Sequence, residues 1–481
     1  MLTSIYLLLL FCFAPAVGFW LFSAFYQILI SPLRHVPGPT LARFTDLYFD
    51  HPEAAQVIYA VGKADKFAKS SFYRAFAVPD AHARPSVFAV EDIKEHAQLR
   101  RLYQSTYAMS ALVSYEDFVN ECADLFDQRL REMAVVAGSA DPAPPADMGH
   151  WFQCYAFDVI AMITYSERLG FLDHGIDVAN IMASLEGFLG YASHVGIYSW
   201  LHPFLFAVRN WFAGKSGSGL EYVINFTQKC MKLRQEKPKG IDNENENTSR
   251  MDFLTKFTAR HEQDPVTYNT WYVLSGCGSN MTAGSDTTAI SLSATLRFLM
   301  DHPETTRKLQ QEVEEHQSRV ADPKNFSFKE TQDMPYLQAV IKEALRLNPA
   351  VGMPLERVVP DGGATIAGQF FPGGTTVGIN SWVEHVNPSV FGPDPTVFRP
   401  ERWFENDKQK LDMMNRHWIP FGMGARTCIG RHISTLEMAK LIPRLVRDFD
   451  FQYPVEIKNE ATTKTYWFVK PHGFKVRIHI R

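Results

Sequence analysis

The sequence is short of cysteine, and its six cysteines are scattered through 481 residues without a CxxC spacing. A disulfide framework needs paired cysteines, so this usage suits reduced thiols in a cytosolic compartment. The sequence also lacks a strong charge imbalance, with a formal net charge of -4 and a pI near 6.5. A nucleic-acid partner is therefore not expected. Hydrophobic residues at 46% and aromatic residues at 13% are sufficient for a sizeable core.

Charge is missing altogether from residues 1–33. The apolar stretch between Ile5 and Ile30 is long enough to cross the hydrocarbon core of a bilayer. A cleavable signal peptide would need a basic start, a shorter apolar core and a small-residue cleavage site, and none of these is clear. Arg34 and His35 follow at once, and positive charge on that side favours a cytosolic body. We therefore expect residues 1–33 to form one uncleaved transmembrane helix.

Two prolines around a glycine at 36–39 (VPGP) cannot continue a helix and predict a stiff turn after the anchor. Residues 34–50 are therefore interpreted as a proline-rich hinge and linker. Neither an internal repeat nor a domain linker divides the remainder, so residues 51–481 are expected to form one catalytic domain.

Two glycines, an arginine and a single cysteine are gathered in segment 421–430 (FGMGARTCIG), directly before a helical pattern of apolar residues. Cys428 therefore lies at a helix N-terminus, where free N–H groups and the helix dipole favour a thiolate, a good ligand for haem iron. Gly424 and Gly430 have no Cβ, so the backbone can lie close to a flat ligand. Arg426 is placed to meet an acidic group at the edge of that ligand. A structural cysteine that caps an ordinary helix is the alternative.

A polar notch interrupts the longest helical pattern, residues 269–300, at positions 283–288 (AGSDTT). Gly284 costs a mid-helix position about 1 kcal/mol relative to alanine, so the helix needs some reason to carry it. A threonine hydroxyl in this notch can bond to the carbonyl four residues back and bend or open the helix. The alternative is an N-cap or a helix-end box.

Segment 421–430 resembles the haem-binding loop of the cytochrome P-450 family, whose pattern F-x-x-G-x-R-x-C-x-G is matched at every fixed position. The family's long helix over the haem carries [AG]-G-x-[DE]-T-[TS], and residues 283–288 match all six positions. The resemblance implies a mainly α fold with a minor β region, one haem b, and iron ligation by the Cys428 thiolate. It also implies that Thr287 holds the distal oxygen or its water and that Asp286 relays protons from solvent.

The same resemblance implies a buried triad behind the haem. Glu343 and Arg346, at i, i+3 in a helical run, match the family's E-x-x-R. Arg402, in segment 398–403 (FRPERW), matches the arginine that completes the triad. On the residues alone, an exposed ion pair explains Glu343 and Arg346 equally well.

Four basic residues are assigned to the haem propionates by the resemblance. His96 and Arg100 share a helix face and match W-x-x-x-R with histidine in place of tryptophan, although a surface pair fits these residues nearly as well. Arg357 and Arg426 match the other two positions. The remaining expectations are Phe421, Cys428 and Gly430 for haem binding, and Ala283, Val351, Gly352, Met353 and Trp467 for a substrate-facing wall.

The implied reaction inserts one atom of dioxygen into a small lipophilic molecule, by hydroxylation or oxidative demethylation in secondary metabolism. Residues 33–48 are similar to those of filamentous-fungal members related to pisatin demethylase. The implied partners are NADPH-cytochrome P-450 reductase, cytochrome b5 as an additional electron donor, and the endoplasmic reticulum membrane, with the catalytic domain in the cytosol. A haem-thiolate isomerase or dehydratase is the first alternative, but such enzymes usually lack an acid–threonine pair such as Asp286–Thr287.

One part of the family pattern is not found. After Asp50 the chain passes directly into residues 51–59 (HPEAAQVIY), which resemble the start of a helix that relatives reach only after a further helix and two strands. Missing strands would leave an unpaired edge in the small β-sheet. This gap makes a non-catalytic membrane haem protein the second alternative.

Overall fold

The computed structural model describes residues 47–49, 51–59, 67–80, 84–134, 144–214, 217, 219–236, 252–319, 325–455 and 462–481. The expected transmembrane helix at 1–33 and the hinge up to residue 46 lie outside these ranges. Within them, the structure contains no helix that is both long and apolar enough to cross a membrane.

The described chain is mainly helical. Its helices are α2 (Pro52–Ile58), α3 (Ile93–Tyr103), α4 (Met109–Leu112), α5 (Glu116–Met133), α6 (Met148–Tyr165), α7 (Phe171–His174), α8 (Ile181–Val195), α9 (His202–Ala213), α10 (Leu220–Glu236), α11 (Phe253–Gln263), α12 (Thr270–Asp301), α13 (Pro303–Gln317), α14 (Phe328–Gln332), α15 (Pro335–Leu347), α16 (Ser381–Glu384), α17 (Pro388–Phe391), α18 (Lys408–His417) and α19 (Arg431–Asp448). The helices are joined by short 3-10 turns, of which η3 (Ser71–Phe76), η6 (Gly196–Leu201) and η8 (Pro400–Phe404) matter below.

The strands are short and lie in four small sheets. They are β1 (Leu47–Phe49), β2 (Ala68–Lys69), β3 (Ala146–Asp147), β4 (Arg357–Val358), β5 (Ala364–Ile366), β6 (Gln369–Phe371), β7 (Thr376–Ile379), β8 (Phe449–Gln452), β9 (Thr462–Thr465), β10 (Val469–His472) and β11 (Lys475–Ile480). The sheet orders are β1-β7-β4-β2, β3-β11-β8, β5-β6 and β10-β9. A mainly α fold with a minor β region is therefore confirmed.

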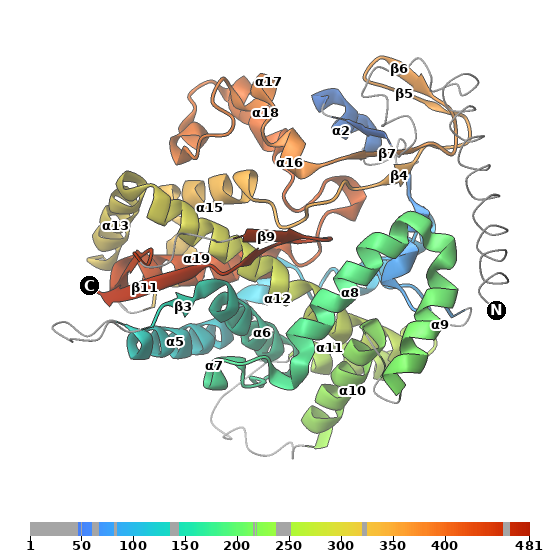
Figure 1. Cartoon of the computed structure of the whole chain (residues 1–481), viewed down its shortest axis with the longest axis horizontal. Helices are drawn as coiled ribbons and strands as arrows, with labels where there is room; N and C mark the ends of the chain where they lie inside the picture. The colour runs from blue at the N-terminus through green and yellow to red at the C-terminus, as the bar shows by residue number, and fades with distance from the viewer. Residues whose placement is uncertain are drawn as a thin grey trace, which may run out of the picture.

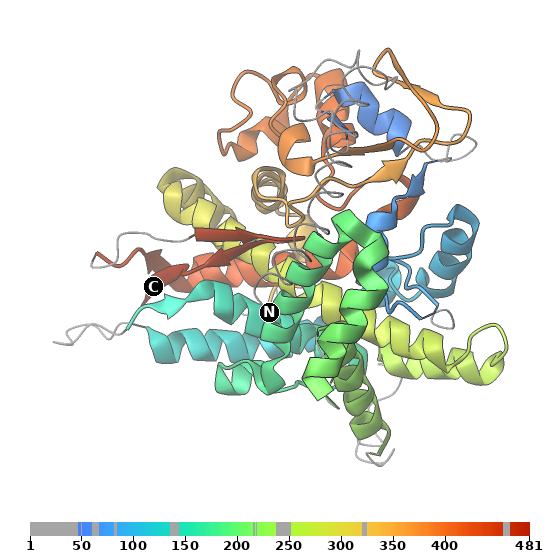
Figure 2. The same ribbon diagram turned by 45° about the vertical axis from the view of Figure 1, so that its right-hand side comes forward.

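Helix α12 runs through the middle of the molecule, between the β-rich part and α2 on one side and α5, α6, α10 and α11 on the other (Figures 1 and 2). It begins after Asn269, whose side chain accepts a hydrogen bond from the Trp271 N–H and so caps a free donor. Gly284 lies where α6 crosses, because a Cβ there would be 2.9 Å from Ile160. Close packing against α6 is therefore the reason that this helix carries a glycine in its middle.

The polar notch at 283–288 does not break α12. The Thr287 hydroxyl donates to the carbonyl of Ala283 at 2.8 Å, as expected, but helical backbone continues from Thr270 to Asp301. Serines and threonines elsewhere on this helix make the same bond, including Ser291 to the Thr287 carbonyl at 2.8 Å. The threonine bond described from the sequence is therefore present, and α12 remains one continuous helix through the notch, so an N-cap or a helix end at this position is excluded.

A strand lies inside the segment interpreted as a linker. Residues 47–49 form β1, which pairs in parallel with β7 and places Leu47 opposite Val377. Strand β7 therefore has neighbours on both sides, β1 on one and β4 on the other. The few residues before α2 thus occupy an edge that the sequence analysis expected to be unpaired.

Candidate active site

The loop 421–430 holds Cys428 directly in front of α19. The Cys428 N–H donates to the Phe421 carbonyl at 2.8 Å and the Thr427 N–H donates to the Gly424 carbonyl at 3.1 Å, which closes the loop on itself. Gly430 is the N-cap of α19. Cys428 is exposed, whereas the other four cysteines in the described part of the chain are buried.

Opposing effects act on the Cys428 thiol. Protein atoms around the sulfur raise the pKa of the thiol by desolvation, although the residue has exposed surface, whereas the backbone N–H groups of Gly430 and Arg431 and the charges of Arg100 and Arg431 lower it. The N–H groups at the start of α19 therefore favour the thiolate, as expected from the sequence. A metal cation bound to the sulfur would favour it further, since a coordinating thiol is deprotonated outright.

The two loop glycines have different roles. A Cβ on Gly424, whose φ is +72°, would lie 2.0 Å from the carbonyl oxygen of Tyr59, so this glycine admits the backbone that follows α2. The expectation that Gly424 faces a flat ligand is therefore wrong. A Cβ on Gly430 would meet nothing closer than the Cys428 sulfur, at 4.0 Å, so the side of Gly430 next to the sulfur is open.

The four basic residues assigned to the propionates come together around His96. Burial, followed by the charges of Arg426, Arg100, Lys69 and Arg357, lowers the pKa of His96 to about 3. His96 and Arg357 are buried. These residues come from α3, β2, β4 and the loop before α19, so the fold gathers cations that are far apart in sequence.

Two of these arginines also hold the neighbouring backbone. Arg100 donates to the Thr427 carbonyl at 2.7 Å, next to the cysteine. Arg426 donates to the carbonyls of Val90 at 2.7 Å and Glu91 at 3.0 Å, just before α3. Arg100 and Arg426 therefore connect the loop that carries Cys428 to α3 and to the segment just before it.

Lys69 was missed by the sequence analysis. It is buried, with its ammonium 3.9 Å from the centroid of the Tyr73 ring and donating to the Phe88 carbonyl at 2.5 Å. Burial, followed by the charges of Arg357 and Arg426, holds the pKa of Lys69 well below its usual range. No motif marks Lys69, because only the pairing of β2 with β4 brings it beside Arg357.

The acid and the threonine of α12 lie in different surroundings. Asp286 is 1% exposed, and its Oδ1 accepts hydrogen bonds from Gln153 and, at 3.4 Å, from Lys470. Thr287 is half-buried, and Ala283, one turn earlier on the same face, is exposed in the middle of an otherwise buried helix. Thr287 and Asp286 are thus adjacent in sequence but point to different sides of α12.

The residues expected to face the substrate form one wall but are not equally open. Val351 pairs with Phe468 in an isolated bridge, and the Gly352 N–H donates to the Trp467 carbonyl at 2.9 Å. Met353 is partly buried and packs on the same apolar cluster. Trp467 is 3% exposed and enclosed by aromatic rings, those of Phe72, Tyr73, Phe76 and Phe88.

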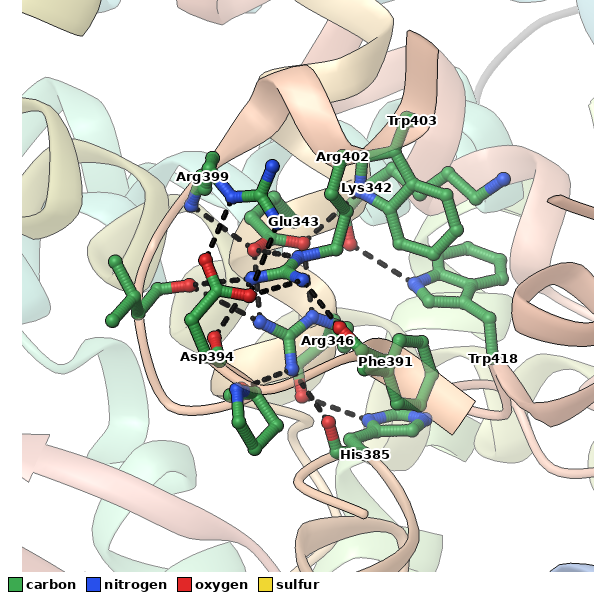
Figure 3. A network of polar contacts seen from close by, with 12 residues as sticks. Lys342, Glu343, Arg346, His385, Phe391, Asp394, Arg399, Arg402, Trp403 and Trp418 are labelled. Atoms are coloured by element: carbon green, nitrogen blue, oxygen red, sulfur yellow. Dashed lines mark hydrogen bonds and ion pairs between the residues drawn. The ribbon is translucent and has the colours of Figure 1, made fainter. Parts of the chain in front are cut away.

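Glu343 lies between two arginines, all three fully or nearly buried (Figure 3). Arg346 makes a two-pronged contact with its carboxylate, at 2.9 Å and 2.8 Å. Arg402, from η8, donates to the same carboxylate at 2.9 Å, and Trp403 adds an indole N–H at 3.0 Å. The structure therefore brings the three residues of the expected triad together.

Backbone carbonyls take up the remaining guanidinium donors (Figure 3). Arg346 donates to the carbonyls of His385 and Pro395, both at 2.5 Å. Arg402 donates to the Phe391 carbonyl at 2.6 Å. The triad thus ties α15 to the segment 385–403, and its charges are satisfied within the protein.

The residues at the Cys428 end of α12 fit a haem. Cys428 and Ala283 are exposed, although α12 and α19 are mostly buried and pack against each other. An accessible cysteine sulfur at a helix N-terminus is a donor for haem iron. The excess of cations around His96 suits the two carboxylates of a haem edge.

Comparisons with known proteins agree with this fit. The family described as Cytochrome P450 matches residues 49–477. A cytochrome P450 monooxygenase of Aspergillus terreus is 35% identical over 90% of this chain and 86% of its own length. A pisatin demethylase of Fusarium vanettenii is 35% identical over 95% of this chain and 92% of its own length. A cytochrome P450 monooxygenase of Emericella nidulans is 32% identical over 93% of this chain and 94% of its own.

The match to the pisatin demethylase extends over 499 aligned positions, more than the 481 residues of this chain, so the relative carries residues that have no counterpart here. The loop around Cys428, the cation cluster, the buried triad and the extent of these matches lead to one conclusion. The chain belongs to the cytochrome P450 family.

Proposed function

We propose that this chain, a haem-thiolate monooxygenase by its family, inserts one atom of dioxygen into an apolar, aromatic small molecule of fungal secondary metabolism. The single observation that carries the proposal is the exposed Cys428 at the start of α19, beside a cluster of cations. The name of the relative from Fusarium vanettenii, pisatin demethylase, supports oxidative demethylation as the reaction.

Cys428 holds the iron, and His96, Arg100, Arg357 and Arg426 hold the propionates. A thiolate-ligated haem supplies the activation of dioxygen, and electron donation from the sulfur favours O–O cleavage. The carbonyl of Phe421 fixes the Cys428 backbone through its 2.8 Å hydrogen bond, so the sulfur keeps one direction. Electrons come from a redox partner, for which we propose the membrane-bound NADPH-cytochrome P450 reductase and, additionally, cytochrome b5.

Thr287 and Asp286 move the protons that this reaction consumes. The Thr287 hydroxyl donates its own proton to the Ala283 carbonyl, so its oxygen lone pairs are free to accept a hydrogen bond in the space beside Ala283. Asp286 lies on the other side of α12, with its Oδ2 lacking a partner among the described residues. A proton therefore passes between them through water or a rotation of the Asp286 side chain.

Replacing Thr287 tests this function. Thr287→Ala removes the hydroxyl but keeps the helix, so we expect haem content and NADPH consumption to persist while product falls severalfold and peroxide rises. NADPH, peroxide and product are measured together with purified reductase. The matched control is Ser291→Ala, which removes the same carbonyl-bonded hydroxyl one turn further along α12. Equal peroxide yields from both variants would mean that Thr287 only supports the helix.

We propose that the body faces the endoplasmic reticulum membrane from the cytosol. An apolar patch on η6 and α9 supports this orientation, because six large side chains there are each more than half exposed: Ile197, Tyr198, Trp200, Phe204, Trp211 and Phe212. Removing residues 1–33 should release only part of the protein from membranes, and the remainder should be released by additional replacement of Trp200 and Trp211 with serine. Fractionation measures both, and complete release by truncation alone would contradict a second membrane contact.

A further inference from the structure

The buried carboxylate of Asp286 lies beside a cation, the ammonium of Lys470. The proton-relay role proposed for Asp286 does not by itself explain this cation. The side chain of Asp286 is 1% exposed, and the ammonium of Lys470 lies 3.4 Å from its Oδ1. Gln153, from α6, donates to the same oxygen. Among the described residues, these two side chains are the polar groups that contact Asp286. An ionised carboxylate at such a depth needs a cation or several donors to remain charged.

Lys470 also contacts a second acid. Its ammonium is 3.9 Å from Oε2 of Glu186, on α8. Lys464 approaches Oε1 of the same glutamate at 3.2 Å, and His472 approaches it at 3.8 Å. The charged groups on this face are thus Asp286 on α12, Glu186 on α8, and Lys464, Lys470 and His472 on the β9–β10 hairpin.

These groups line one small pocket between α8, α12 and the hairpin. Its polar wall consists of Glu186, Asp286, Lys464 and Lys470, and its apolar wall includes Leu189 and Phe468. The hairpin is close to α8, since a Cβ on Gly190 would lie 3.5 Å from the Tyr466 ring. In this pocket, the buried carboxylate of Asp286 therefore lies together with charged side chains that are partly exposed to solvent.

Exposure decides which of the two contacts of Lys470 matters more. The Glu186 side chain is 28% exposed, so water screens its attraction to Lys470. The Asp286 side chain is buried, so its attraction to the same ammonium is screened little. Removing the charge of Lys470 should therefore change Asp286 far more than it changes Glu186.

We propose that Lys470 is a positioning residue that keeps Asp286 ionised and turned toward the hairpin, and that Glu186 ties its ammonium to α8. The proposal rests on the proton-relay role proposed above for Asp286. Lys470 makes no contact with the reacting atoms in this assignment, and it acts only through the carboxylate. The hairpin thereby joins the proton route to α8, whose exposed continuation through η6 and α9 carries the proposed membrane patch.

The test is the infrared spectrum, at neutral pH, of the haem-loaded, full-length protein labelled with 13C-aspartate. The wild-type protein should show no protonated carboxyl band from Asp286. Lys470→Met should show such a band. The band should be absent from the double variant Lys470→Met/Asp286→Asn, which assigns it.

Two controls separate the charge of Lys470 from its packing. Lys470→Arg keeps the charge and should show no band at neutral pH. Lys464→Met removes an equal charge from the same hairpin, but Lys464 contacts Glu186 and is 55% exposed, so this variant should show no Asp286 carboxyl band, like the wild-type protein. If Lys470→Met loses its haem spectrum, Lys470→Gln serves as the uncharged variant. A folded, uncharged Lys470 variant without the band would overturn the proposal.

The readout does not depend on catalysis, so it separates this proposal from the proton-relay role. Peroxide release with reductase and NADPH is measured on Asp286→Asn in parallel. If that variant releases no more peroxide than wild type while Lys470→Met shows the carboxyl band, the relay role of Asp286 fails and the positioning by Lys470 stands. If peroxide rises in Asp286→Asn and the band is missing from Lys470→Met, the relay stands and the positioning fails.

Discussion

Two buried groups of basic side chains in this molecule differ in how their charge is balanced. In the triad, Arg346 and Arg402 share the carboxylate of Glu343, Asp394 pairs with Arg402 at 3.3 Å, and backbone carbonyls accept further hydrogen bonds from both arginines. Around His96, four cations lower its pKa in addition to the effect of burial. The acid next to this cluster is Glu356, which is buried and accepts from Ser70 at 2.5 Å.

The difference separates a structural device from a binding site. A balanced buried cluster holds its segments together and needs nothing from outside, whereas removal of one partner leaves an uncompensated charge. An excess of like charges costs free energy until an anion joins them. We therefore expect the triad to stabilise the protein with or without haem, and the cation cluster to be stable only with the propionates in place.

The largest expected effect comes from breaking the balanced cluster. Glu343→Gln leaves Arg346 and Arg402 facing a neutral amide at 0% and 2% side-chain exposure, so the free energy of unfolding should fall by about 3–5 kcal/mol. Chemical denaturation of the haem-loaded protein measures it. Asp394→Asn is the matched control, because Asp394 pairs with Arg402 at 3.3 Å but is 32% exposed, and it should cost about 1 kcal/mol or less. Equal losses from the two variants would mean that burial does not distinguish these pairs.

Two buried histidines, one beside each cluster, should make the free energy of unfolding depend on pH. Burial lowers the pKa of His385, beside the triad, to about 3, and burial followed by four cations does the same for His96. The unfolded chain binds protons on these residues below about pH 6.5 while the folded chain does not. Each therefore lowers stability by about 1.4 kcal/mol per pH unit as the pH falls from 6.5 toward 3.

The two contributions should respond differently to haem. His385 donates to the Arg346 carbonyl and accepts from the Ile419 N–H, both at 2.8 Å, so haem leaves its surroundings unchanged. Propionates would raise the pKa of His96 and so remove its share of the acid sensitivity. Denaturation of haem-depleted and haem-loaded protein between pH 6.5 and 5 measures both slopes. Equal slopes would place no anion beside His96.

The smallest effect on the fold should come from the cation cluster itself. Arg357→Met removes one of the like charges, so the haem-depleted protein should be unchanged or slightly more stable, by up to about 1 kcal/mol. Haem should then be lost severalfold faster to an acceptor protein. Arg346→Met, the matched change in the triad, should destabilise both forms. A destabilised haem-depleted Arg357→Met protein would contradict the proposed difference between the two clusters.

Local patterns in the sequence were sufficient for much of this site. The loop around Cys428, the α12 segment and the partners of Glu343 all lie in short spacings that fix helix faces and turns. Lys69 and the Lys470–Asp286 contact could not be found in this way, because they depend on strand pairing and on packing between distant elements. The desolvation of Cys428 could likewise not be found in this way, since burial follows from the whole fold.

The segment before α2 shows the same limit. The sequence analysis predicted that relatives carry residues after Asp50 that this chain lacks. It did not show that residues 47–49 would pair with β7, because three residues carry no strand pattern of their own. Three residues without a strand pattern can therefore pair with an edge of the small sheet that the sequence analysis expected to be unpaired.

The central claim is that Cys428, at the start of α19, ligates haem iron. Cys428→Ser replaces the thiol by an alcohol that stays protonated near neutral pH, so thiolate ligation should be lost while the triad and the cation cluster remain. The measurement is the Soret spectrum of the reduced, carbon-monoxide-bound protein. We predict that the thiolate-type band of the wild-type protein is absent from Cys428→Ser, and an unshifted thiolate-type band in this variant would contradict the account.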